Sequence, residues 1–302
     1  MLSILIPVYN TVVGGLVEDL HRQCLDTGVD FEILCYDDAS EEKYKKANAK
    51  LKGLAKVRYV ELEKNIGRAA IRNLLAAEAQ YRYLLFIDAD SRVINEDYIK
   101  RYVSMLSPGC VIYGGRQYQE EMPADRNKIL HWKYGKKKES LPVSKRIRKP
   151  YLNFMSNNFV IDREILKKVP FDMEHSGYGY EDTLFAFMLK KNGYAVTHVA
   201  NPLVHTGLED TAVFLSKTIE AMRNLAGLYA EGKIKTTRLI DIYRLMDKNF
   251  VLPLILNFVR KNKGSLFENF FSDNPNVTSL QVYKMYVFDK FYKKLKKAST
   301  KE

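Results

Sequence analysis

The sequence predicts an α/β fold in which helices flank a mostly parallel sheet, followed by a helical C-terminal extension. Three observations lead to this expectation. Short apolar runs, typical of buried strands, alternate with stretches of helical periodicity over residues 1–115. Several of these runs end in polar or acidic residues, where parallel sheets place their binding sites. From about residue 210 onward the pattern is helical.

The first part of the chain supplies most strands of this sheet. Its apolar runs predict strands at residues 2–8, 31–40, 57–62 and 82–90. The helical stretches between them lie at residues 16–27, 41–52 and 68–80. Strands that alternate with helices in this way form parallel βαβ units with right-handed crossovers. The polar residues expected at the carboxyl ends of these strands, and hence near a binding site, are Tyr9, Asn10, Asp37, Asp38, Asp88 and Asp90.

The rest of the chain continues the pattern with one irregular region. We expect further strands at residues 111–114, 152–161 and 195–199. Helices are expected at residues 96–106, from about residue 163, at residues 183–192 and 210–231, and two or three more within residues 236–297. Between residues 116 and 150, eleven Lys or Arg residues, three prolines and little periodicity predict a mobile loop or hairpin region.

The chain is basic, with a formal net charge of +12 over 302 residues. This charge suits an anionic partner, such as a nucleotide, a nucleic acid or an acidic lipid surface. The three cysteines show no metal-type spacing and are typical of reduced thiols in a cytosolic protein. Because no signal-peptide pattern and no apolar run of membrane-spanning length are visible, we expect a soluble or peripheral protein.

One apolar run ends in Asp88-Ala89-Asp90, two carboxylates separated by one residue. In an extended segment, Asp88 and Asp90 would point the same way, because residues two apart share a face. Two such anions repel unless a cation lies between them, and Mg²⁺ or Mn²⁺ would leave positions free for phosphate oxygens. A solvated turn after a buried strand is the alternative, and the motif alone does not decide.

The second predicted strand ends in Asp37-Asp38-Ala39-Ser40. A carboxylate at a strand end can accept the imide N–H of uracil or an amino group of another base. We favour this nucleotide contact for Asp38, because the neighbouring strand ends are also acidic. Asp and Ser are also preferred at helix N-caps, and for Ser40 both interpretations stay open.

The segment from Asn65 to Asn73 combines a glycine with two arginines. Gly67 would let the backbone approach a ligand closely. Arg68 and Arg72 lie four residues apart, on one helix face near its N-terminus, where anions bind favourably. These residues are candidates for contact with phosphate or base; for Arg72 the alternative is an ion pair with a surface carboxylate.

Glu181 and Asp182 follow a Gly-rich turn at residues 177–180 and begin a predicted helix. The glycines permit a backbone that brings a carboxylate into a cleft, where it could act as a general base. In the alternative interpretation, the two acids only complement the helix dipole. Further along, His205 is either a structural histidine or a nitrogen ligand for a metal already held by oxygens.

Taken in order, five segments resemble the landmarks of family-2 glycosyltransferases: SILIPVYN, CYDDAS, NIGRAAIRN, FIDADS and GYGYEDT. The resemblance implies a GT-A-type, Rossmann-like catalytic domain over residues 1–215, with the basic mobile segment at about 116–150. Residues 216–302 would form a helical extension, which matches nothing that we can name. One departure is Ala39, where family members more often carry glycine. We expect alanine to be accepted there only with a negative φ and a slightly different local backbone.

The resemblance also implies the donor and its contacts. Family members use a nucleotide-diphospho-sugar, with inversion at the anomeric carbon. By position, Pro7, Tyr9 and Asp38 would line the nucleoside site, and Asp88 would contact the ribose or the metal. The full set of candidate nucleotide-sugar contacts is Pro7, Tyr9, Asn10, Asp38, Asn65, Gly67, Arg68, Arg72 and Asp88.

For the metal and the reaction, the resemblance implies four residues. Asp90 would bind Mn²⁺ or Mg²⁺ bridging the diphosphate, and His205 would complete the metal shell. Asp182 would be the catalytic base, with Glu181 beside it contacting the acceptor or supporting the base. The expected reaction is a single displacement at the anomeric carbon by an acceptor hydroxyl.

We therefore predict a hexosyltransferase-type enzyme that uses a UDP-sugar and a glycan or lipid-linked acceptor in bacterial surface polysaccharide synthesis. The cytoplasm, at the inner face of the cell membrane, is the expected location. Aromatics and lysines alternate over residues 283–297, which suits either an anionic membrane surface or a helix packed on the domain. The rival functions are a nucleotidyltransferase, a basic nucleic-acid-binding protein and a silent sugar-nucleotide binder. No nucleic acid is expected, because clustered carboxylates repel phosphate unless a metal is present, and this function would leave them unexplained.

Overall fold

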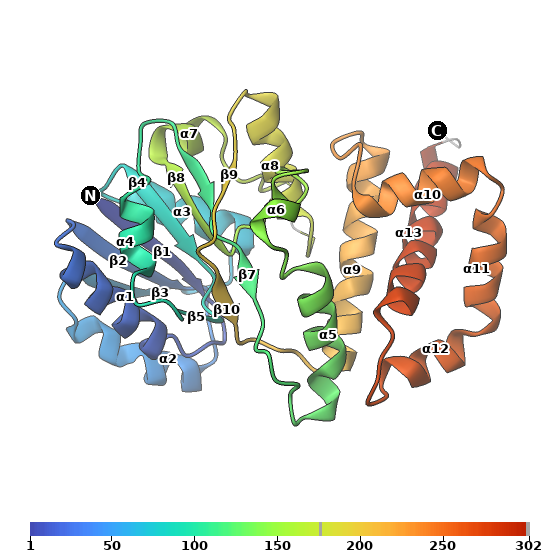
Figure 1. Ribbon diagram of the computed structural model, residues 1–302, viewed down its shortest axis with the longest axis horizontal. Helices are drawn as coiled ribbons and strands as arrows, with labels where there is room; N and C mark the ends of the chain where they lie inside the picture. The colour runs from blue at the N-terminus through green and yellow to red at the C-terminus, as the bar shows by residue number, and fades with distance from the viewer. Residues whose placement is uncertain (175–176, 300–302) are drawn as a thin grey trace. The chain divides into compact units, whose positions relative to one another are not determined.

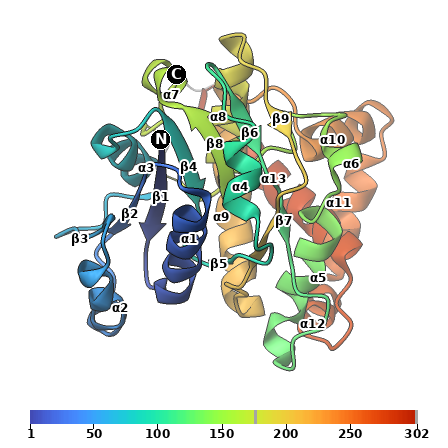
Figure 2. The same ribbon diagram turned by 60° about the vertical axis from the view of Figure 1, so that its left-hand side comes forward.

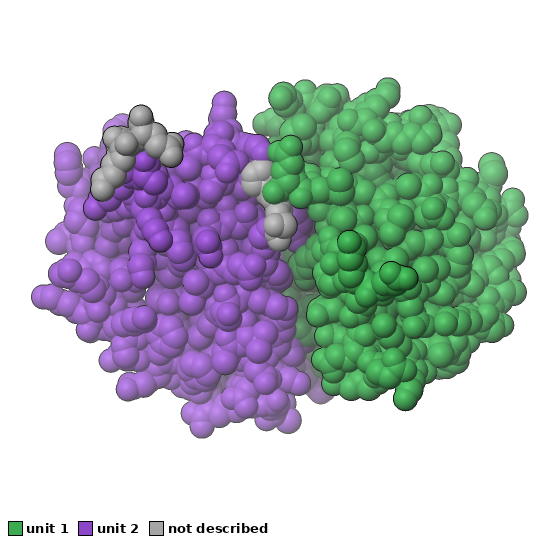
Figure 3. Space-filling model, turned by 180° about the vertical axis from the view of Figure 1, so that it is seen from behind, with its two compact units in different colours: residues 1–119, 140–176, 185–207 green, residues 120–139, 177–184, 208–302 purple. Residues whose placement is uncertain are grey.

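The computed structural model describes residues 1–174 and 177–299, and the chain divides into two compact units (Figures 1 and 3). The first unit comprises Met1–Gln119, Ser140–Ser176 and Phe185–Gly207. The second comprises Glu120–Glu139, Gly177–Leu184 and Leu208–Glu302. The chain therefore passes between the units five times. The sequence predicted one domain boundary, after residue 215, and this boundary stays a prediction.

A seven-stranded sheet forms the first unit, with the strand order β3-β2-β1-β4-β8-β6-β9. The strands are β1 (Leu2–Val8), β2 (Phe31–Asp37), β3 (Val57–Glu61), β4 (Tyr83–Ile87), β6 (Val111–Tyr113), β8 (Asn158–Asp162) and β9 (Thr197–His198). β1 runs parallel to β2 and β4, β2 to β3, and β6 to β9. Only β8 is antiparallel to its neighbours β4 and β6. The predicted α/β fold with a mostly parallel sheet is confirmed.

Helices bury both faces of this sheet (Figure 2). On one face, α1 (Gly14–Thr27) and α4 (Tyr98–Val103) contribute to a hydrophobic core that includes Ile4 of β1. On the other face, a second core includes Leu5 and residues of α3 (Arg68–Glu78), α7 (Arg163–Lys168) and the C-terminal part of α8 (Glu181–Lys191). Because alternate residues of β1 enter opposite cores, the strand is apolar throughout, as parallel strands usually are. A short 3-10 helix, η1 (Ala49–Gly53), adds Leu51 to the first core, and α2 (Glu42–Asn48) precedes it.

A second, three-stranded sheet lies beyond the end of β4. It consists of β5 (Ser91–Arg92), β10 (Leu203–His205) and β7 (Arg116–Gln117), in the order β5-β10-β7. β10 runs antiparallel to β5 and places His205 opposite Ser91. This small sheet brings two distant segments of the chain to the turn after β4.

Residues 116–150 contain helices where the sequence predicted a loop or hairpin. They include η2 (Arg126–Lys128), α5 (Ile129–Lys138) and α6 (Val143–Arg146). Tertiary contacts explain the helix at α6: the guanidinium of Arg146 is 3% exposed and donates to the carbonyls of Tyr113, Gly114 and Val199. The expectation of irregular structure was wrong; the mobility of this segment stays a prediction.

Most of the second unit is helical, which confirms the predicted extension. Its main helices are α9 (Thr211–Ala230), α10 (Arg238–Lys248), α11 (Leu252–Lys261), α12 (Lys263–Phe270) and α13 (Val277–Ser299). Four of them lie in the region where two or three were expected. α13 contacts both α9 and α11. No helix within residues 1–174 and 177–299 has the length and apolar character to cross a membrane.

The aromatic residues of α13 pack inside this helical unit. Tyr283 and Phe288 are 4% and 0% exposed. The Phe288 ring lies 5.2 Å from that of Tyr243, and the Tyr243 hydroxyl donates to Asp289 at 2.8 Å. Of the two interpretations of residues 283–297, the packed helix accounts for these buried rings.

Candidate functional site

Two loops at the carboxyl end of the sheet are tied together by Asn10 and Ser40. The backbone N–H of Asn10 donates to Ser40 Oγ at 2.7 Å, and Asn10 Oδ1 accepts from the N–H of Glu41 at 2.8 Å. Ser40 therefore joins two loops and does not cap α2, whose N-cap residue is Glu41. Pro7 lies near the end of β1, and Tyr9, in the loop that follows, is 55% exposed.

The turn after β2 is closed by Asp37. This fully buried carboxylate accepts from the N–H of Ser40 at 2.7 Å and from the hydroxyl of Tyr59 at 2.7 Å. Within the turn, Ala39 has φ 61°. The expectation of a negative φ was wrong, because the hydrogen bonds of Asp37 hold a tight turn in a left-handed conformation that normally favours glycine.

Asp38 holds the loop that precedes α3. Its side chain accepts from the backbone N–H groups of Ile66 at 2.7 Å and Gly67 at 3.0 Å, and its carbonyl accepts from the Asn65 amide at 3.1 Å. Asp38 is 5% exposed. Gly67 has φ 86° and ψ 164°, a region open essentially to glycine alone. Asp38 therefore fixes the backbone that leads into Arg68, the first residue of α3.

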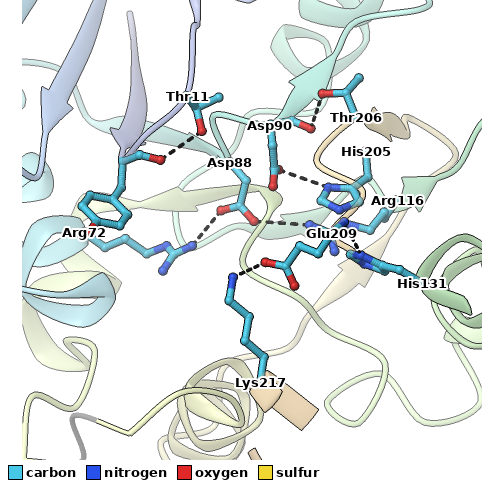
Figure 4. A network of polar contacts seen from close by, with 11 residues as sticks. Thr11, Arg72, Asp88, Asp90, Arg116, His131, His205, Thr206, Glu209 and Lys217 are labelled. Carbon is cyan, nitrogen blue, oxygen red and sulfur yellow. Dashed lines mark hydrogen bonds and ion pairs between the residues drawn. The ribbon is translucent and has the colours of Figure 1, made fainter. Parts of the chain in front are cut away.

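Asp88 and Asp90 do not share the face of a strand as expected. β4 ends at Ile87, and the chain turns at once into β5, which pairs with β10 instead of extending the large sheet. In this turn, Asp88 Oδ1 accepts from Arg72 at 2.7 Å, and Oδ2 lies 3.4 Å from Arg116 (Figure 4). The guanidinium of Arg72 is buried, and it pairs with a half-buried carboxylate, not with one at the surface.

Asp90 points toward His205, and its Oδ1 lies 3.2 Å from His205 Nδ1 (Figure 4). The backbone carbonyl of Asp90 accepts from both the N–H and the hydroxyl of Thr206, at 2.8 and 2.9 Å. At Gly207, a Cβ atom would come within 2.5 Å of Asp90 Oδ2, so only glycine fits beside this carboxylate without a shift. The two sheets thus fix Asp90 against the end of β10.

The pKa of Asp90 reflects two opposing effects. Burial would raise the pKa of this carboxyl, but contact with His205 and the charges of Arg116 and Arg68 outweigh burial and lower the pKa below its usual range. Asp90 is therefore ionised at neutral pH, which is the form that a metal requires.

The Asp90–His205 pair fits a divalent metal. Two donors bound at right angles to one ion, each about 2.1 Å away, lie about 3 Å apart, and the observed separation is 3.2 Å. Asp90 Oδ1 is buried, and apart from the contact with His205 it accepts no hydrogen bond from the described residues. Across residues 1–174 and 177–299, no group of three or more His, Cys, Asp or Glu could hold a metal. Substrate oxygens or water could supply further ligands.

In the second unit, α9 supports the Gly-rich turn that precedes Glu181. The N–H of Tyr178 donates to Glu220 at 3.2 Å, and the side-chain amide of Asn224 donates to the carbonyls of Gly177 and Gly179. A Cβ atom at Gly179, where φ is 86°, would lie 2.7 Å from the Cβ of Ala221. Close approach to α9 therefore requires this glycine.

Glu181 and Asp182 form the first turn of α8, directly after Tyr180, which has φ 70°. Both acids are half-buried. They belong to the second unit, whereas Asp38, Asp88 and Asp90 belong to the first.

Most of the residues predicted to contact the nucleotide-sugar are thus linked to one another within the first unit. Hydrogen bonds join Asp38 to the Asn65–Gly67 loop, an ion pair joins Arg72 to Asp88, and Asp90 contacts His205. Sequence reasoning missed Arg116, which it assigned to a loop, and the support from Glu220 and Asn224. The spacing of Glu220 and Asn224, four residues apart on one helix face, was the only available signal.

The family model for glycosyl transferase family 2 matches residues 3–171. An uncharacterized glycosyltransferase of Rickettsia felis is 30% identical over 118 residues, covering 39% of this chain and 19% of its own length. Chondroitin synthase of Escherichia coli is 24% identical over 230 residues, covering 64% of this chain and 32% of the synthase. The chain thus spans about a fifth to a third of these curated relatives.

Two solved structures show the same fold. A mannosyltransferase of Pyrobaculum calidifontis, in complex with GDP-Man and Mn²⁺, has a TM-score of 0.54 at 16% identity, covering 76% of this chain and 63% of that chain. TarS 1–349 of S. aureus, in complex with UDP-GlcNAc, has a TM-score of 0.51 at 16% identity, covering 99% and 91%.

These matches agree with the five sequence landmarks and with the mostly parallel sheet of the first unit. The family model covers more than half of the chain. This chain belongs to glycosyl transferase family 2 and has a GT-A-type fold.

Proposed function

We propose that this protein is an inverting, metal-dependent glycosyltransferase that moves a sugar from a UDP-sugar to a hydroxyl group. The acceptor we propose is a glycan or a lipid-linked glycan of a bacterial surface polysaccharide. Relatives that synthesise polysaccharide support this assignment, as does the UDP-GlcNAc bound to the similar TarS structure.

The observation that carries the proposal is the Asp90–His205 pair in the turn after β4. It combines an ionised carboxylate and an imidazole at a separation of 3.2 Å. The pair lies in the same unit as the Asp38-supported loop and the N-terminus of α3. A metal and a nucleotide diphosphate would both use this combination of groups.

The residues of the first unit would bind the donor. Tyr9 and Asp38 would contact the nucleoside, and Arg68, at the start of α3, would attract the diphosphate. Mn²⁺ or Mg²⁺ held by Asp90 and His205 would supply positive charge that stabilises the departing diphosphate. Asp88, fixed by two arginines, would bind the ribose or the metal.

Asp182 would take the proton from the acceptor hydroxyl as its oxygen attacks the anomeric carbon. A single attack from the face opposite the diphosphate inverts the configuration. Glu181 would contact the acceptor or keep Asp182 in place. Because the turn before these acids is bonded to α9, the second unit would position the base.

Donor hydrolysis tests the substrate and metal assignments together. Purified protein is incubated with UDP-, GDP- and dTDP-sugars, each with Mn²⁺, with Mg²⁺ or with EDTA. Release of UDP that depends on the metal is expected. A parallel incubation contains a nucleoside triphosphate, a sugar 1-phosphate and the metal. Release of pyrophosphate there, with formation of the nucleotide-sugar, would instead identify a nucleotidyltransferase.

The Asp182→Asn variant tests the base. General-base assistance is worth roughly 10²–10⁴-fold, so transfer to an acceptor should fall by about that factor. The Kd for the donor should stay unchanged. Glu181→Gln is the matched control and should lose less transfer activity. Transfer by Asp182→Asn at the rate of the unchanged protein would show that another group is the base.

A further inference from the structure

Apolar side chains are exposed along α10 and α11 of the second unit. Figure 1 shows that α11 follows α10 directly. We define the α10–α11 apolar face as six exposed residues: Ile242, Leu245, Phe250, Val251, Leu254 and Phe258. Among them, Phe250 is 84% exposed and Leu254 70%. Single exposed apolar residues are ordinary, but several on adjacent helices mark an interaction surface.

Helix α11 is apolar on two sides. Leu252 and Val259, seven residues apart, are 2% and 0% exposed and face the interior of the unit. Val251, Leu254 and Phe258 follow the same helical spacing on the outer side and are 41%, 70% and 55% exposed. A surface helix normally carries polar residues on its outer side. The outer side of α11 therefore suits an apolar environment that the chain itself does not provide.

Phe250 occupies a position where glycine would be favoured. It follows α10 with φ 60°, the N–H of Phe250 donates to the carbonyl of Asp247, and that of Val251 donates to the carbonyl of Met246. This pair of hydrogen bonds is the Schellman motif, whose left-handed residue is usually glycine. The sequence thus keeps a large apolar side chain, held outward, at a position where it strains the backbone.

The two helices that carry this apolar face are also basic. Residues 238–263 contain six Lys or Arg against two Asp. Four of the basic residues, Arg244, Lys248, Arg260 and Lys261, are exposed on the same two helices. A second copy of the chain would bring the same positive charges together across a symmetric contact, which is unfavourable. The charge is complementary to an anionic partner.

We propose that the α10–α11 hairpin binds the surface of an anionic lipid bilayer, with Phe250 and Leu254 inserted among the acyl chains. The lysines and arginines would then meet the lipid headgroups, each adding attraction that is screened by salt. The site differs from the one expected from sequence, because Tyr283 and Phe288 are buried within the unit and none of the aromatics of residues 283–297 is fully exposed. The proposal does not depend on the donor or on the reaction.

Vesicle flotation of the full-length protein tests this proposal directly. One set of vesicles contains phosphatidylcholine with phosphatidylglycerol, and the other contains phosphatidylcholine alone. At low salt, the protein is expected to float with the anionic vesicles and to be released by 0.5 M NaCl only in part, because apolar insertion remains. Equal binding to both kinds of vesicle, or none to either, would overturn the proposal.

The variants Phe250→Gly and Leu254→Ser separate membrane binding from folding. Each should reduce binding to anionic vesicles roughly tenfold, which corresponds to the loss of one inserted apolar side chain. Phe250→Gly should also raise the midpoint of urea unfolding, because it removes the strained φ. Weaker vesicle binding by a variant that is more stable cannot be explained by misfolding. Leu25→Ser, at a residue 56% exposed in the first unit, is the matched control and should bind normally.

Self-association is the competing outcome. Light scattering on the same variants shows whether the face joins two copies of the chain. If Leu254→Ser converts an oligomer into a monomer while vesicle binding is unchanged, the face is a protein interface and the membrane proposal is wrong. All these variants should hydrolyse the donor in solution at the rate of the unchanged protein. Failure of the membrane proposal can therefore be distinguished from failure of the proposed function.

Discussion

Arg72 donates to Asp88 at 2.7 Å, and this pair determines how the turn after β4 is held. The Arg72 side chain is 5% exposed and that of Asp88 is 23% exposed. The buried arginine therefore has its strongest charge partner within the protein. Arg72 was predicted to contact phosphate or base; its position indicates that it would act on the donor through Asp88.

Replacing Arg72 should destabilise the fold. Arg72→Met leaves a half-buried carboxylate with Arg116 alone, and we expect the free energy of unfolding to fall by about 2 kcal/mol. Urea unfolding at pH 7 measures this change. In the double variant Arg72→Met/Asp88→Asn, part of the loss should be recovered, because the side chain that loses Arg72 is no longer charged. Additive losses in the two single variants would show that the ion pair does not stabilise the protein.

Asp90 and His205 should determine the affinity for Mn²⁺, which can be measured without turnover of a substrate. Titration of Mn²⁺ in the presence of UDP, followed by the electron paramagnetic resonance signal of free Mn²⁺, gives the affinity. Asp90→Asn and His205→Ala should each weaken it roughly tenfold or more. Asp97→Asn, on an exposed residue at the start of α4, is the control. Unchanged Mn²⁺ affinity in Asp90→Asn would exclude this carboxylate as a ligand.

Ala39→Gly should stabilise the protein. Alanine at φ 61° is strained, and glycine relieves that strain at a smaller cost in entropy, so a gain of about 1 kcal/mol is expected. Ala70→Gly, within α3, should have the opposite sign and lose about 1 kcal/mol. Thermal unfolding of both variants compares them. A loss of stability in Ala39→Gly would contradict the left-handed conformation.

Acid should destabilise the first unit through His198. Burial lowers the pKa of His198 to about 4; the charge of Arg146 adds to this effect, and a hydrogen bond to the carbonyl of Pro150 opposes it. Since the unfolded chain takes up this proton near pH 6.5, the contribution is fully present above that pH and is lost as the pH falls toward 4. The loss amounts to roughly 3 kcal/mol at most. Urea unfolding of His198→Gln should lack this part of the pH dependence.

The sequence predicted β1, β2 and β4 within a few residues, because these strands are buried on both faces and form continuous apolar runs. The edge strand β3, in which only Tyr59 is buried, was also found within a few residues. The end of β4 was placed too late, since the Asp88-Ala89-Asp90 segment continues the run without glycine or proline. The turn there depends on pairing between β5 and β10, residues more than a hundred positions apart.

Helices α5 and α6 could not be predicted from local sequence. Residues 116–150 contain eleven Lys or Arg and three prolines and show little helical periodicity. The helix α6 is held by the buried Arg146, whose guanidinium donates to carbonyls of distant segments. In the same way, Asp38 was correctly placed at a strand end, but its hydrogen bonds to Ile66 and Gly67 depend on the register of two loops. The sequence indicated which residue types lie at the ends of the strands. It did not indicate which distant residues they contact in the fold.

The hydrogen bonds from α9 to the Gly177–Tyr180 turn affect how family members can be recombined. A gene shortened to residues 1–215 would encode the five landmarks yet lack Glu220 and Asn224, which anchor that turn. A chimera that joins residues 1–215 to the C-terminal helices of another family member would also lack Glu220 and Asn224. We therefore expect α9 and the Gly177–Asp182 segment to be exchanged together between family members. A functional chimera should take both segments from the same protein.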